Sequence, residues 1–157
     1  MPITPETGSL FHAETQLGVG RYSTEDGAAL WRRNLTELST CPNVVVKIGG
    51  LGMPVAGHGF EFEARPARSH LLAEAWRPHV ETCIELFSPE RSMFESNFPV
   101  DKQSCSYTAL WNSFKIITSS MSVDERQALF FGTAARTYNL ELANYSTGFR
   151  KKRSDNR

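Results

Sequence analysis

One stretch of ten residues, PNVVVKIGGL at positions 42–51, contains the clearest strand of the chain. Its centre, Val44-Val45-Val46-Lys47-Ile48, is rich in β-branched residues and is bounded by Pro42 and by Gly49-Gly50. A short apolar run between turn residues is typical of a parallel strand that is buried on both faces. A parallel strand needs a neighbour, so a second strand is expected along the chain.

That second strand is predicted at residues 92–98, SMFESNF, which Pro99 closes. A helix is predicted between the two strands, from Ser69, whose side chain can cap it, to Phe87, with a kink at Pro78. Strand, helix and strand in this order are typical of a right-handed βαβ unit with parallel strands.

Helical spacing of apolar residues predicts three further helices. One begins at Ser23 or Thr24 and ends near Thr40, before the first strand. Two follow the second strand, over residues 107–117 and 122–138. The fold class is therefore predicted to be α/β, although two strands are too few to complete a parallel sheet.

Composition excludes several classes of function. The 157 residues include 17 Lys and Arg against 17 Asp and Glu, so no overall basic field is available for nucleic acid. No stretch approaches the ~20 apolar residues of a membrane-spanning helix. Three widely spaced cysteines with no C-x-x-C pair favour a reducing, cytoplasmic setting: Cys41, Cys83 and Cys105. We therefore expect a small-molecule substrate as the partner, and neither nucleic acid nor a membrane.

In α/β proteins the functional residues lie where strands end and loops begin. Side chains alternate along a strand, so Lys47 shares a face with Gly49, and Glu95 shares a face with Asn97. Lys47 and Glu95 are accordingly expected to form an ion pair. Two interpretations of this pair stay open: an electrostatic pair in an active site, or a structural pair that fills a polar barrel interior.

The long loop at residues 49–68 is glycine-rich, and loops of this length are often functional. Its G-x-G lacks the third glycine of a nucleotide-binding loop, which favours a flexible active-site loop over a phosphate site. Gly50 and His58 in this loop are candidates for substrate contact. His70 and His79 are assigned to helix packing or the surface, and the sequence contains no H-x-H or H-E-x-x-H pair of metal ligands.

Three segments occur in a familiar order: PNVVVKIGGL at 42–51, RSMFESNFPVDK at 91–102 and GTAARTY at 132–138. Together they resemble the last strands and terminal helix of the amidohydrolase-related, TIM-barrel metal-dependent hydrolases of the amidohydrolase-2 type, which include sugar and dicarboxylate lactonases and decarboxylases. The resemblance implies a partial TIM barrel holding the last two or three β/α units, with parallel strands and C-terminal helices. The resemblance assigns residues 21–142 to the C-terminal part of a barrel. Composition predicts an irregular N-terminal segment at 1–20, and the run of Lys and Arg predicts a disordered basic tail at 143–157.

The resemblance also implies roles for single residues. Asn97 stands where the family commonly has an aspartate that serves as metal ligand or general base, and a neutral amide can do neither well. His12 has a spacing comparable to that of the family's strand-six histidine, whereas the first-strand H-x-H is absent from this chain. A divalent metal such as zinc is thus implied by the resemblance alone, and no residue is assigned as its ligand.

The function expected from these features is that of an amidohydrolase- or lactonase-type hydrolase, in which water attacks a carboxylic ester, lactone or amide of a small polar substrate. The candidate catalytic residues are Asn97, Asp101 and His12, and the candidate substrate-binding residues are Lys47, Glu95, Gly50 and His58. The alternative is a non-catalytic half-barrel fragment or a partner-dependent interaction module. A (β/α)₈ barrel takes about 250 residues, so we expect self-association or a second chain that supplies the missing strands.

Overall fold

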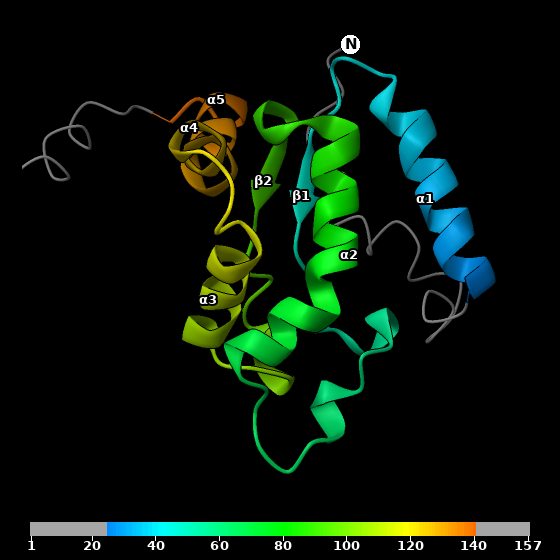
Figure 1. The fold of residues 1–157 in the computed structure, drawn as a ribbon, viewed down its shortest axis with the longest axis vertical. Helices are drawn as coiled ribbons and strands as arrows, with labels where there is room; N and C mark the ends of the chain where they lie inside the picture. Colours follow the sequence, from blue (N-terminus) through cyan, green and yellow to red (C-terminus); the bar gives the residue numbers. More distant parts are fainter. Residues whose placement is uncertain (1–24, 141–157) are drawn as a thin grey trace, which may run out of the picture.

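A computed structural model describes residues 25–140 of the chain (Figure 1). The predicted N-terminal segment at 1–20, with the candidate His12, and the predicted basic tail at 143–157 lie outside the described residues. Among the helices of the described part, none combines the length and the hydropathy that crossing a bilayer requires.

Two parallel strands form the sheet. β1 (Val46–Ile48) pairs with β2 (Ser92–Phe94), with Val46 opposite Ser92 and Ile48 opposite Phe94. α2 (Ser69–Phe87) connects them and runs alongside β1 in Figure 1. The α/β class and the βαβ connection predicted from the sequence are confirmed.

Both strands are shorter than the predicted stretches 44–48 and 92–98. Before β1, the backbone N–H of Val44 donates to Cys41 O in a turn, so this residue is not available for the ladder. After β2, Glu95 N still donates to Ile48 O at 3.0 Å, but the chain then turns at Asn97, whose φ is 50°. Turn geometry at each end therefore limits the sheet to three residue pairs.

The remaining helices follow the predicted order. They are α1 (Glu25–Ser39), α3 (Tyr107–Ile117), α4 (Val123–Gln127) and α5 (Thr133–Thr137). A π-helical turn at Ala128–Gly132 joins α4 to α5, so the single helix predicted at 122–138 is interrupted. Ser122 begins this region with a capping box, in which its side chain accepts from Glu125 N and Glu125 binds back to Ser122 N.

Two predicted local features need correction, and a third is confirmed. Ser69 does not cap α2, because it is already the first helical residue and Arg68 occupies the cap position without a side-chain bond. The loop at 49–68 contains two 3₁₀ turns, at Pro54–Ala56 and Phe60–Phe62, where no regular structure was expected. Pro78 does lie inside α2, and Figure 1 shows this helix bent along its length, as predicted.

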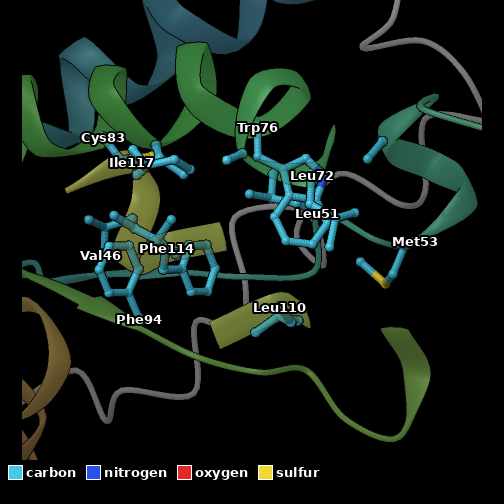
Figure 2. Close-up of a cluster of buried hydrophobic side chains, with 14 of the residues drawn as sticks. Val46, Leu51, Met53, Leu72, Trp76, Cys83, Phe94, Leu110, Phe114 and Ile117 are labelled. Atoms are coloured by element: carbon cyan, nitrogen blue, oxygen red, sulfur yellow. The ribbon is translucent and has the colours of Figure 1, made fainter. Parts of the chain in front are cut away.

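The core lies between the sheet and the helices. Figure 2 shows Val46 and Phe94 of the strands beside Phe114 of α3, and the ring of Trp76 in α2 lies 6.0 Å from that of Phe114. The rings of Phe94 and Phe114 stack with centroids 4.3 Å apart and planes 9° from parallel. Because side chains alternate along a strand, this packing leaves Lys47 and its register partner Met93 on the opposite face of the sheet.

Arg91, which lies just before β2, binds the end of α1 and the turn that leads into β1. Its guanidinium donates to the carbonyl oxygens of Ser39 and Cys41, each at 3.0 Å, and lies over the ring of Phe87, 5.3 Å from the centroid. These carbonyls belong to the end of α1 and the turn before β1, where backbone acceptors are otherwise unsatisfied. One side chain thus fixes the entry of the chain into β1.

Candidate functional site

The candidate site lies at the carboxyl ends of the two strands. The segments that follow β1 and β2 leave the sheet on the same side, below the strands in Figure 1. In parallel sheets this edge is where side chains from several loops can act together. The described candidates from the sequence, apart from His58, are on or next to these two strand ends.

Lys47 and Glu95 form the predicted ion pair. Lys47 Nζ lies 2.5 Å from Glu95 Oε2, and the two side chains are 28% and 18% exposed. Burial lowers the pKa of Lys47, but the hydrogen bond and charge of Glu95 raise it by more, so the net shift is upward. The ammonium group is therefore charged at neutral pH, as a partner for an anionic or polar group.

Gly49 makes room for this pair. A Cβ atom at this position would collide with Glu95 Cγ and would come within 2.8 Å of Glu95 O. The Glu95 side chain therefore lies across the backbone of β1 toward Lys47. Its second oxygen, Oε1, is buried and has no hydrogen-bond donor among residues 25–140.

Asn97 and Asp101 form a second linked pair. Asn97 Nδ2 donates to Asp101 Oδ1 at 2.7 Å, which directs the amide oxygen of Asn97 away from the carboxylate. Asp101 is 0% exposed, and its Oδ2 accepts from Gly52 N at 3.1 Å. Burial raises the pKa of Asp101 to about 6, against the lowering effect of the Asn97 and Gly52 bonds, and the nearby Glu95 charge adds to the rise.

Gly52 and Ser104 complete a connection that the sequence did not reveal. Ser104 Oγ donates to Gly52 O at 2.6 Å, so Gly52 is bound through both its N–H and its carbonyl. A Cβ atom at Gly52 would lie 3.0 Å from Asp101 Cγ, so the close approach requires glycine. The loops after β1 and β2 are thereby held together. The one signal in the sequence is the G-x-G spacing at Gly50 and Gly52, which by itself predicts only a flexible loop.

Gly50 serves as a turn residue in the same loop. Its φ is 71°, which L side chains rarely adopt, and its carbonyl accepts from Met53 N at 3.1 Å. The residue is buried beside the candidate site. Its role in shaping the loop is visible, whereas its predicted contact with a substrate remains a prediction.

His58 is placed in a different environment. Its ring lies 5.7 Å from that of His79 in α2 and 5.8 Å from Phe60, and His79 in turn lies 5.3 Å from Trp31 in α1. Burial, together with the nearby His79, lowers the pKa of His58 to about 4, and burial also lowers the pKa of His79, so both rings are uncharged at neutral pH. The contacts found within residues 25–140 connect His58 to this aromatic cluster and not to Lys47.

The described residues do not fit a metal centre. Within residues 25–140, no three His, Cys, Asp or Glu side chains gather as ligands. Both oxygens of Asp101 already accept hydrogen bonds, and Asn97 donates its amide nitrogen to that carboxylate. A neutral amide is also a weak ligand for a hard cation. No chemical step of this site is therefore derived through a metal.

Comparison with known proteins identifies relatives. The amidohydrolase family model of the amidohydrolase-2 type matches residues 17–140. An uncharacterized protein of Sinorhizobium fredii is 44% identical over 108 residues, which are 69% of this chain and 32% of that protein. The L-fucono-1,5-lactonase of Burkholderia multivorans is 34% identical over 128 residues, 78% of this chain and 40% of the lactonase. The chain thus spans well under half the length of the curated relatives it matches.

Solved structures that resemble this chain are also amidohydrolases. Two crystal structures of an amidohydrolase from Burkholderia multivorans, one with bound HEPES and one with bound zinc, superpose with TM-scores of 0.62 and 0.59. Each is 28% identical and covers 88% of this chain and 43% of that protein. The parallel strand pair and its helices are consistent with part of an amidohydrolase barrel. A family model that covers most of the sequence, with these relatives, shows that the chain belongs to the amidohydrolase family.

Proposed function

We propose that the chain acts in hydrolysis of a carboxylic ester, lactone or amide of a small polar substrate, with lactones as the leading class. The observation that carries this proposal is the convergence of the Lys47–Glu95 pair and the Asn97–Asp101 pair at one end of the parallel strands. The family and the lactonase relative support a hydrolase. In barrels of parallel strands, the catalytic residues lie at this carboxyl-terminal edge of the sheet.

The proposed roles follow from the chemistry of each group. Water adds to the carbonyl carbon, the bond from that carbon to the leaving oxygen or nitrogen breaks, and a water proton passes to the leaving group. Asn97, held by Asp101, offers its amide oxygen to orient the attacking water. Lys47 offsets the negative charge that develops on the carbonyl oxygen. Asp101 is fully buried, so in this proposal it acts as a positioning residue through Asn97.

Hydrolysis of a lactone panel by the full chain tests this proposal. Acid release is followed with a pH indicator, for the chain and for the variant Asn97→Leu, which keeps side-chain size but removes the amide. We expect the variant to lose about a hundredfold in kcat/KM, the scale seen when one oriented polar group is removed. Glu85→Gln, in a surface ion pair with Arg32, is the matched control. Equal rates for the chain and Asn97→Leu would contradict the proposed site.

A second function is favoured by the sheet itself. It has two strands among residues 25–140, so each presents an outer edge that no described strand covers. Unpaired strand edges are templates for pairing with another chain. We propose as the alternative a non-catalytic, partner-dependent interaction module, or a chain that self-associates through these edges. Light scattering of the purified chain distinguishes the cases, because a monomer at all concentrations contradicts self-association.

A further inference from the structure

Only one of the two oxygens of the Glu95 carboxylate has a partner among the described residues. Its Oε2 binds Lys47 Nζ, whereas its buried Oε1 has no donor within the described part of the chain. A buried acceptor without a hydrogen bond is unfavourable, and more so when it carries charge. Such atoms are few in folded proteins and call for an explanation. Among the buried side-chain atoms of residues 25–140 that lack a partner, Glu95 Oε1 is the one carboxylate oxygen, and it lies at a strand end of the candidate site, where a ligand donor would satisfy it.

The neighbouring charges restrict the kind of donor. A ligand ammonium group would satisfy Glu95 but would be repelled by Lys47 Nζ, which lies against the same carboxylate. A ligand carboxylate would be attracted to Lys47 but repelled by Glu95, and by Asp101 whenever that side chain is ionised. A neutral hydroxyl fits both groups, because it can donate to the carboxylate and accept from the ammonium at once.

We propose that Glu95, with Lys47, binds a hydroxyl group of the substrate, so that Glu95 selects neutral hydroxylated compounds over unsubstituted and anionic ones. This inference rests on the proposed function and names the substrate group that the pair recognises. Glu95 is thereby a specificity-determining residue rather than only the structural partner of Lys47.

The pair is accessible enough for this role. Lys47 is 28% exposed, and its ammonium has two N–H donors beyond the one directed at Glu95. The terminal torsion of a glutamate is broad, so the carboxylate can turn. Oε1 can then face a ligand hydroxyl while Oε2 stays near Lys47 Nζ. Gly49 beneath Glu95 carries no side chain that would block this movement.

Binding of probes that have no hydrolysable bond tests the inference separately from catalysis. The probes are tetrahydropyran, a set of epimeric anhydrohexitols that add hydroxyl groups to the same ring, and the uronic-acid forms of those rings, which add a carboxylate. We expect titration calorimetry of the full chain to show at least one anhydrohexitol bound about tenfold or more tightly than tetrahydropyran and than its acid. If no anhydrohexitol binds better than tetrahydropyran, the inference is wrong, whatever the hydrolysis assay shows.

Variants assign the selectivity to Glu95. Glu95→Gln should weaken binding of the best anhydrohexitol about tenfold to a hundredfold and leave tetrahydropyran unchanged, because the charged acceptor is lost. The double variant Lys47→Met/Glu95→Gln removes both charges and remains foldable if the single variant is unstable. It should bind the hydroxylated and plain rings alike. Hydroxyl selectivity that survives in the folded double variant would overturn the proposal, and Glu85→Gln should match the unmodified chain.

Discussion

The Glu95 side chain lies across Gly49. Because Gly49 has no side chain, the Glu95 carboxylate can occupy the space beside it. The backbone oxygen of Glu95 would be 2.8 Å from a Cβ atom placed on Gly49. This contact joins the residue after β1 to the residue after β2, and it brings Glu95 Oε2 to Lys47 Nζ. The ion pair thus depends on a glycine that takes no part in it chemically.

Gly49→Ala should therefore disrupt the site. The new methyl group meets both the side chain and the backbone of Glu95. The side chain would have to turn away from Lys47, and the backbone carbonyl would have to shift in the residue whose N–H donates to Ile48 O. We expect a loss of about 2–4 kcal/mol in the free energy of unfolding, measured with urea. Gly132→Ala is the control, because its Cβ would be 3.5 Å from the nearest atom, an ordinary contact. Similar losses for both variants would contradict this account.

The Lys47–Glu95 pair should behave asymmetrically when it is broken. Lys47→Met alone leaves a largely buried carboxylate without its partner, which we expect to lower the unfolding free energy by about 2–3 kcal/mol. Lys47→Met/Glu95→Gln, with no charge left, should lie within about 1 kcal/mol of the unmodified chain. A double-mutant cycle in urea gives both values. Additive losses would show that the two groups do not interact.

Asp101 should make stability fall as pH rises through about 6. The pKa of Asp101 is raised in the folded chain from 3.8 to about 6, so the folded state holds its proton where the unfolded state has lost it. Its stabilising contribution is complete below about pH 4 and is lost as pH rises through 6. Relative to the unmodified chain, Asp101→Asn should gain about 1–3 kcal/mol between pH 4 and 7. A difference between the two that stays constant with pH would contradict the burial of an ionisable carboxyl.

His58 should act in the opposite direction. The pKa of His58 is lowered from 6.5 to about 4, so the unfolded chain takes up its proton first as pH falls. The contribution of neutral His58 is complete above about pH 6.5 and is lost toward pH 4. His58→Gln should therefore reduce the loss of stability in acid, measured by thermal unfolding across this range. His70→Gln, on an exposed position of α2, should leave the acid loss as it is.

Arg91 should contribute more to stability than an arginine in a surface ion pair. Arg91→Met removes the hydrogen bonds to Ser39 O and Cys41 O and the contact with Phe87, with an expected loss of about 2–3 kcal/mol. Arg32→Met, which breaks the exposed pair with Glu85, should lose less than about 1 kcal/mol. Denaturant unfolding of both variants provides the comparison. An equal loss would mean that the end of α1 does not need this anchor.

The parts of the fold that depend on periodicity were predictable. Residues 107–117 form the predicted helix, because the apolar spacing is helical and Ser106 caps it by accepting from Ala109 N. The Lys47–Glu95 pair was predictable for the same kind of reason, since alternation along two strands places both side chains on one face. Regular local geometry is enough to fix these features.

The parts that depend on turns and on distant contacts were not predictable. The bond between Gly52 and Asp101 joins positions 49 apart in sequence and needs two irregular loops to meet. The direction of the His58 side chain, toward His79, is likewise set by a loop without a period. The strand ends were overestimated because the turn bond of Val44 and the positive φ of Asn97 are tertiary features that composition does not reveal.

We expect the pairing of Val46 with Ser92 to form late in folding. The two residues are 46 positions apart, so their contact closes a long loop, which is entropically unfavourable until α2 has formed and shortened it. Long-range parallel pairing is slow for this reason, and helix contacts close in sequence form earlier. We expect the Lys47–Glu95 pair to assemble after the rate-limiting step, so that breaking it speeds unfolding and leaves the folding rate nearly unchanged.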